Sequence, residues 1–88
     1  MYIDKDELNI YEVESIYQTL LKELNNDSIV IDMTKVNKID MSVIQLFISA
    51  KITFQEHSKF FKLENVNKEV SDILKSCACD FLLGIDDE

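Results

Sequence analysis

The chain has 88 residues, 47% of them hydrophobic and 30% charged, which is a globular composition with room for one domain spanning residues 1–88. Its formal net charge is −8 and every basic residue is Lys, which disfavours nucleic-acid binding and binding to anionic membranes, since both need clustered cations. No apolar run approaches the ~20 residues that span a bilayer, and the first residues lack the basic and apolar regions of a signal peptide. We therefore expect a cytoplasmic protein without membrane insertion.

The first 24 residues predict two short strands and a helix. Tyr2-Ile3 and Leu8-Asn9-Ile10 flank the turn-prone segment Asp4-Lys5-Asp6, which predicts a weak β-hairpin. From Glu12 to Leu24 the apolar residues recur at a spacing of three and four, so this segment predicts an amphipathic helix with one buried face.

The middle of the chain predicts a central strand and a second helix. Residues 28–32 form a β-branched run bounded by polar residues, which predicts a strand covered on both faces. After a loop through residues 33–38, Asp40 can cap a helix because its carboxylate accepts the N–H groups that the first turn leaves without partners. The helix predicted from Met41 to Glu56 is apolar almost all round, which indicates either burial on several sides or a face that awaits a partner.

The last third predicts one more strand, at residues 60–63, and a third helix from about Asn67 whose apolar spacing continues to Phe81. Helices thus separate the strands, an order that leads to crossovers onto a partly parallel sheet. The predicted fold class is α/β: a mixed four- to five-stranded β-sheet with helices packed on it.

Several segments, taken in order, resemble the STAS domain family, named for sulphate transporters and anti-sigma factor antagonists. The resemblance rests on Leu8-Asn9-Ile10-Tyr11, Ile29-Val30-Ile31-Asp32, Val36, Ile39-Asp40, Gln45-Leu46, Phe61-Lys62-Leu63, Val66, Val70, Ile73 and Leu74. It implies a small STAS-like domain that docks a protein partner through the turn and N-terminus of the second helix. In the bacterial antagonists this turn reads Asp, then a Ser or Thr that a partner kinase phosphorylates, then a small residue and Gly.

The phosphorylation motif is degenerate in this chain. Asp40 matches the family Asp, but Met41 occupies the phosphoacceptor position and Val43 that of the Gly. Met41 cannot carry the charge that phosphorylation would add at a helix N-terminus; it offers either an adaptable apolar contact or an ordinary first-turn side chain. Ser42, one residue late, is a candidate phosphorylation position, and the alternative is a serine that bonds the local backbone.

The resemblance implies a partner-binding surface of Asp40, Met41, Ser42 and Ile44. Lys38 lies beside it, within residues 28–64, which hold five lysines and four acids and are thus the part of the chain that is not acidic. The expected function is a non-enzymatic, bacterial, anti-sigma factor antagonist-like module of signal transduction, regulated without the usual serine switch. Its partner would be an anti-sigma factor, a kinase-like protein or a complex subunit. The alternative is a constitutive accessory subunit of a larger complex such as a lipid-transport ATPase or signalling assembly. A reduced first strand could also leave a sheet edge open for a homodimer.

Catalytic and metal-binding patterns are missing from the sequence. Cys77 and Cys79 are too few and too close together for a disulfide framework and predict reduced thiols. His57 is the sole histidine and no ligands follow a zinc spacing, so no metal or cofactor is expected. Asp32 follows an apolar strand, as phosphoacceptors of response regulators do, but the acidic pair that such a site needs after an earlier strand is missing. The acids of residues 86–88 predict a solvated end.

Overall fold

The computed structural model describes residues 1–25, 28–79 and 82, and in these residues it places three helices and a 3-10 turn against four short strands. The helices are α1 (Val13–Leu24), α2 (Met41–Glu56) and α3 (Lys68–Ser76), the 3-10 turn is η1 (Ile10–Glu12), and the strands are β1 (Glu7–Leu8), β2 (Ile29–Asp32), β3 (Lys38–Ile39) and β4 (Phe61–Glu64). The α/β fold class is confirmed.

The described strands form two parallel pairs rather than one mixed sheet. β1 pairs with β3, and β2 pairs with β4 along its whole length. Tyr2 makes an isolated parallel bridge to Asp32, so the first residues run beside β2. The predicted N-terminal hairpin is therefore wrong: its two apolar halves, which bury Ile3 and Leu8, each join a strand from later in the chain instead of each other.

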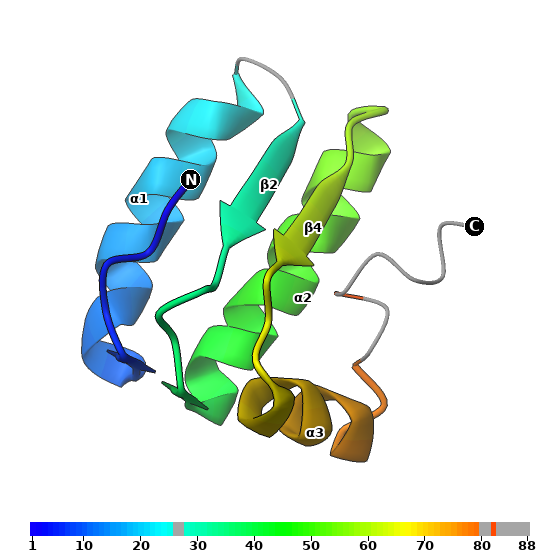
Figure 1. Cartoon of the computed structure of the whole chain (residues 1–88). Helices are drawn as coiled ribbons and strands as arrows, with labels where there is room; N and C mark the ends of the chain where they lie inside the picture. The colour runs from blue at the N-terminus through cyan, green and yellow to red at the C-terminus, as the bar shows by residue number, and fades with distance from the viewer. Residues whose placement is uncertain (26–27, 80–81, 83–88) are drawn as a thin grey trace.

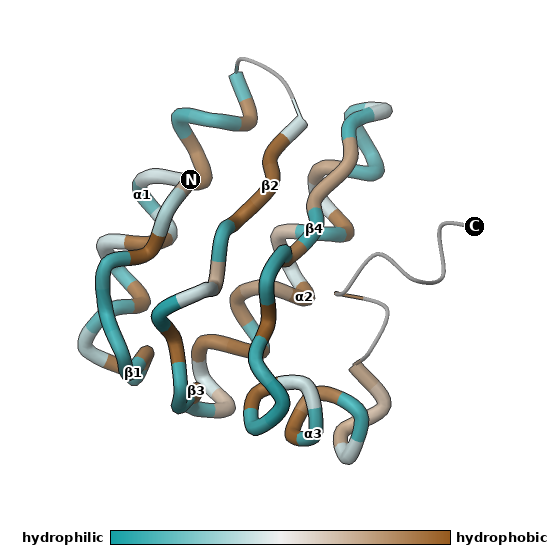
Figure 2. The backbone as a smooth tube through the Cα atoms, in the orientation of Figure 1, coloured by the Kyte–Doolittle hydropathy of each residue, from teal (hydrophilic) through white to brown (hydrophobic). Residues whose placement is uncertain are grey.

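The strands form one layer and α1 and α2 form the other, as Figure 1 shows. Burial alternates along both long strands: Ile29 and Ile31 of β2 are buried under the helices, whereas Val30 and Asp32 are half-buried. The prediction that β2 is covered on both faces is thus not met. Figure 2 shows the same division in β4, where apolar and polar residues alternate along the tube.

Helix α2 supplies much of the core, which explains its unusual apolar content. Phe47 and Phe54 are buried and pack against the Phe61 ring of β4, with ring centroids 5.8 and 5.9 Å away. Lys51 is buried on the same helix, and its ammonium donates to the Phe61 carbonyl at 3.3 Å. Ile52 is half exposed, so α2 still shows apolar surface to solvent.

Helix α3 ends earlier than its apolar spacing predicts. Ala78 has a positive φ of 57°, and its N–H donates to the Lys75 carbonyl while that of Cys79 donates to the Leu74 carbonyl. These two bonds form a Schellman motif, which ends a helix whatever the spacing beyond it. The predicted helical position of Phe81 lies outside the described residues.

Candidate functional site

The turns that follow β1 and β3 lie side by side because the two strands are parallel and in register. Leu8 pairs with Ile39, so the chain leaves both strands at the same end. The Asp40 N–H donates to the Leu8 carbonyl at 2.9 Å, and η1 contacts α2. Figure 1 shows that α1 and α2 begin at this end and that α3 lies beside it, next to the start of α2.

Asp40 caps α2, as predicted. Its backbone is extended, with φ −89° and ψ 153°, and its carboxylate accepts from the Ser42 N–H at 3.4 Å. The Asp40 carbonyl accepts from the N–H groups of Val43 and Ile44 at 3.0 and 3.1 Å. The side-chain bond is long for its type, and Asp40 is exposed to solvent.

Met41 is exposed at the start of α2, with 47% of its surface accessible. Its thioether sulfur lies 3.8 Å from the Cys77 thiol sulfur at the end of α3. Met41 is therefore accessible at the start of α2, which both roles predicted from the sequence allow.

Ser42 and Ile44 do not face solvent in the way their predicted roles need. The Ser42 hydroxyl oxygen is buried and has no hydrogen-bond partner in the described part of the chain, so it neither bonds the local backbone nor is presented to a kinase. Ile44 is fully buried in the core. We therefore remove Ile44 from the binding surface: α2 is apolar on nearly every side, and its spacing alone did not identify the exposed face.

Two lysines precede Asp40 in the chain, and they differ in their surroundings. Lys38 is exposed on β3, next to Asp40. Lys35 instead forms an ion pair with Asp4, with 2.9 Å between its ammonium and the Asp4 carboxylate. The hydrogen bond and charge of this pair raise the pKa of Lys35 and lower that of Asp4.

A shallow hollow lies between the β1–β3 pair and α3. Its lining joins residues of three elements: Glu7, Leu8, Lys38, Ile39, Asp40 and Ile73. Ile73 is the apolar contribution from α3 and is partly exposed. Sequence spacing placed Ile73 on the apolar face of α3, but it gave no indication that this residue lines a hollow together with Asp40.

Two exposed apolar residues at this end were missed from the sequence. Ile10 and Tyr11, in η1, are 61% and 88% exposed. The sequence favours a strand through Ile10, yet Asn9 caps the turn, its side chain accepting from the Tyr11 N–H at 2.9 Å. Asn at a helix start is a known signal, so Asn9 could have indicated that the strand ends before Ile10.

We name the strand-end surface as the set of exposed side chains gathered around the two turns: Ile10, Tyr11, Lys38, Asp40, Met41 and Ile73. Apolar side chains from η1, α2 and α3 contribute to it, and one cation and one anion lie among them. Such an exposed apolar group with charges at its border is typical of a protein-binding site.

Asp32 is occupied by structural bonds. Its carboxylate accepts from the Thr34 N–H at 3.0 Å, from the Thr34 hydroxyl and from the Asn65 side-chain amide at 3.2 Å. The Thr34 bonds, followed by that of Asn65, lower the pKa of Asp32. The carboxylate thereby links the end of β2 to the residue that follows β4. Among the described residues, no group of three or more His, Cys, Asp or Glu side chains could hold a metal ion.

The comparisons with known proteins identify a family. A family model described as "Mlab, STAS domain" matches residues 5–84, nearly the whole chain. No curated protein matches this sequence. In the described residues, no helix combines the length and the apolar content that crossing a membrane requires.

Proposed function

Because this chain belongs to the STAS domain family, we propose that it is a non-enzymatic regulatory module, similar to an anti-sigma factor antagonist, that binds a protein partner through the strand-end surface. The observation that carries the proposal is the exposure of Met41, Ile10 and Tyr11 at one end of the molecule. We take residues 1–88 as one STAS-like domain acting in a bacterial cytoplasm.

The apolar part of the surface would supply most of the binding energy. Tyr11 is the most exposed aromatic residue described, and Tyr is enriched among residues that dominate interfaces. Met41 adds an unbranched side chain that adapts to irregular partner surfaces. Burying these side chains against a partner would contribute a favourable free energy of about 25 cal/mol for each Å² of apolar area removed from water. The costs of association reduce this gain.

The charges would orient the partner. Lys38 and Asp40 lie on either side of Ile39 in the chain, and both are exposed. Glu7 lines the hollow between the β1–β3 pair and α3 together with them. Charges at the border of an interface affect the association rate and the choice of partner more than the affinity. An overall charge of −8 favours a partner with a basic face.

Regulation by serine phosphorylation is not part of the proposal. Met41 occupies the family's phosphoacceptor position, and the Ser42 hydroxyl oxygen is buried. Phosphorylating Ser42 would require the first turn of α2 to open before the kinase could reach the oxygen.

Substituting Met41 tests the binding surface. Immobilised wild type would be used to capture proteins from a lysate of the source cells, and the protein retained most strongly would be purified. Calorimetry would then compare its binding to wild type, Met41→Glu and Gln55→Glu. Gln55 is a matched control because it is exposed on α2 about 20 Å along the helix axis from Met41. We expect Met41→Glu to weaken that binding at least about tenfold, since a charge replaces a buried apolar contact. Equal affinity of the two variants would contradict the proposed surface.

Kinase treatment tests the absence of the switch. After incubation with ATP and the kinases encoded near this gene, the intact mass should not change. A stoichiometric gain of about 80 Da mapped to Ser42 would overturn this half of the proposal and leave the docking surface standing.

A second candidate function is a constitutive accessory subunit of a larger complex, such as a lipid-transport ATPase. It is favoured by apolar exposure away from the strand-end surface: Ile52 and Phe60 are about half exposed, and Tyr17 and Leu21 border an apolar groove between α1 and α2. A subunit would lose its complex on Ile52→Glu rather than on Met41→Glu. Size-exclusion chromatography would show an oligomer of the isolated chain, because obligate interfaces are strongly apolar.

A further inference from the structure

The end of α3 brings two thiols to the border of the strand-end surface. Cys77 is the C-terminal cap of the helix and is exposed, with its sulfur 3.8 Å from that of Met41. Cys79, two residues later, is 6% exposed and belongs to the hydrophobic core. Neither is joined in a disulfide.

The two cysteines are held close together by the motif that ends the helix. Ala78 between them has its φ at 57°, and the Cys79 thiol donates to the Cys77 carbonyl at 3.3 Å. Two residues span at most about 7 Å of chain, and a disulfide needs Cα atoms about 4.4–6.8 Å apart. The spacing therefore allows the two sulfurs to bond once the turn rearranges.

We propose that Cys77 and Cys79 form a peroxide-sensitive dithiol that regulates the strand-end surface. The Cys77 thiolate attacks hydrogen peroxide and becomes a sulfenic acid with release of hydroxide, which takes up the thiol proton as water. The Cys79 thiol then displaces water from the sulfenic acid and forms the disulfide. In sum, two thiols lose two electrons and two protons, and one peroxide becomes two waters.

Disulfide formation would change the surface through two contacts. The Cys79 sulfur would leave its place in the core, and the Cys77 sulfur would leave Met41. The Cys77 N–H donates to the Ile73 carbonyl at 3.1 Å, so rearranging the turn also disturbs the residue through which α3 contributes to the surface. Oxidation thus acts on Met41 and Ile73 together.

The chemical step can be tested without any partner. The chain would be labelled with ¹³C at the methyl groups of its three methionines, of which Met33 is fully buried and serves as the internal control. Treatment with equimolar hydrogen peroxide should remove both thiols together, lower the intact mass by about 2 Da and shift the Met41 methyl resonance while Met33 stays in place. Dithiothreitol should reverse all three changes.

The variant Cys77→Ser checks that the response comes from this pair. Because Cys77 is exposed, the substitution leaves the core intact; the variant should show no loss of 2 Da and no peroxide-induced shift of Met41. A gain of about 16 Da at Met41 or Cys77 as the stable product, a disulfide-linked dimer, or a disulfide that leaves Met41 unmoved would each overturn the proposal.

The binding consequence rests on the proposed function, and a second arm separates the two. The protein captured by wild type would be titrated against the reduced chain, the oxidised chain and the reduced Met41→Glu variant. We expect at least a tenfold weaker affinity after oxidation and full recovery on reduction. Equal affinity of the reduced and oxidised chains, while Met41→Glu still abolishes binding, would overturn the switch alone; normal binding by Met41→Glu would overturn the proposed function.

Discussion

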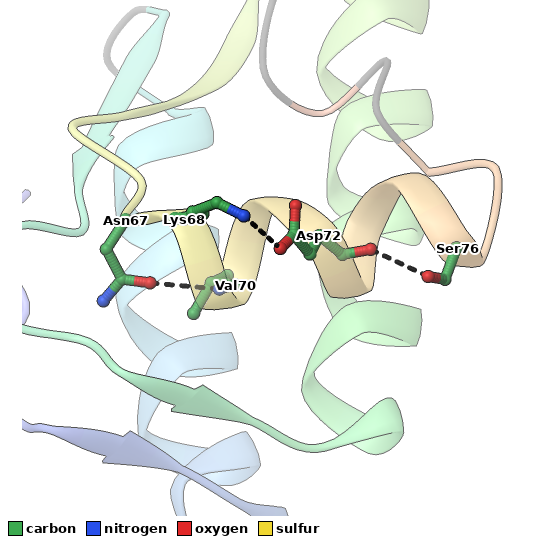
Figure 3. A network of polar contacts seen from close by, with 5 residues as sticks. All are labelled: Asn67, Lys68, Val70, Asp72 and Ser76. Carbon is green, nitrogen blue, oxygen red and sulfur yellow. Dashed lines mark hydrogen bonds and ion pairs between the residues drawn. The ribbon is translucent and has the colours of Figure 1, made fainter.

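The first turns of α3 and α2 use related capping side chains in opposite ways. At α3, Asn67 accepts from the Val70 N–H at 3.0 Å, as Figure 3 shows, and its amide donates to the Val36 carbonyl and to the Asn37 side chain. At α2, the Asp40 side chain makes one hydrogen bond within the described part of the chain, and this bond is 3.4 Å long. Asn67 thus joins α3 to the loop before β3, whereas Asp40 supports only its own turn.

The difference indicates which helix start has a structural duty and which leaves its side chains available. The donors and acceptors of Asn67 are satisfied within the chain, and Val70 in the same turn is fully buried. Around Asp40 the neighbours Lys38 and Met41 are exposed. A cap with bonding capacity to spare, next to apolar surface, is the kind of site a partner can complete.

Replacing Asn67 should have the largest effect on stability. Asn67→Ala removes the cap and leaves the Val36 carbonyl without its donor, so we expect the free energy of unfolding to fall by about 2 kcal/mol. Urea denaturation followed by circular dichroism measures this. Asn37→Ala, which removes only one of the three bonds, is the control and should cost less; equal losses would mean that Asn67 is no more than an ordinary cap.

Replacing Asp40 should have a smaller effect. Asp40→Ala removes one long bond, and we expect a loss of about 0.5–1 kcal/mol in the same urea measurement. Asp40→Asn should restore most of it, since Asn is an equally good cap. A loss as large as that of Asn67→Ala would remove the contrast between the two helix starts.

An exposed ion pair within α3 should contribute less again. Lys68 and Asp72 lie four residues apart, with 3.4 Å between their charged atoms and most of the Lys68 side chain in solvent (Figure 3). Lys68→Ala should lower the free energy of unfolding by about 0.3 kcal/mol or less, and 1 M salt should remove the difference. A larger loss would show that surface charge, rather than the Asn67 cap, holds α3 in place.

The last prediction concerns the pKa of Asp32, whose carboxylate accepts several bonds, whereas the side-chain amide of Asn67 donates two and accepts one. The bonds from Thr34, followed by that of Asn65, lower the pKa of Asp32 in the folded chain below the ordinary value of 3.8. The stability from these bonds is therefore fully present above pH 3.8 and is lost as the pH falls through the lowered pKa. Carbon-detected NMR titration should find Asp32 titrating below its ordinary value, and Thr34→Ala should raise its pKa; an unchanged pKa in that variant would contradict the assigned cause.

The parts of the fold that depend on local chemistry were predictable. Helix α1 followed from its apolar spacing, and the Asp40 cap from a carboxylate placed directly before an apolar run. Strand pairing was not predictable in the same way. The two apolar segments at Tyr2-Ile3 and Leu8 suit a hairpin, but the first lies beside β2 and the second pairs with β3, and this depends on where those later strands lie in the fold.

The sequence indicated where the candidate site lies in the chain, but not which side chains are exposed there. The Asp40 turn lies where the sequence indicated, with Met41 exposed. Ile44 was assigned to the surface because the family resemblance implies docking at the start of α2, and the apolar residues on nearly all sides of this helix gave no periodic signal that Ile44 is buried. Tyr11 was missed because exposure of an aromatic side chain depends on what the rest of the chain leaves uncovered, which no local pattern encodes.

The parallel pairing of the strands also determines how the chain must fold. The bridge of Tyr2 to Asp32 and the pairings of β1 with β3 and β2 with β4 all join residues roughly 30 positions apart. Each pairing closes a long loop before it gains any contact, and such non-local closure slows folding relative to a helical bundle. We therefore expect folding on the order of milliseconds rather than microseconds, with α1 and α2 gaining their stability only when the strands they cover have met.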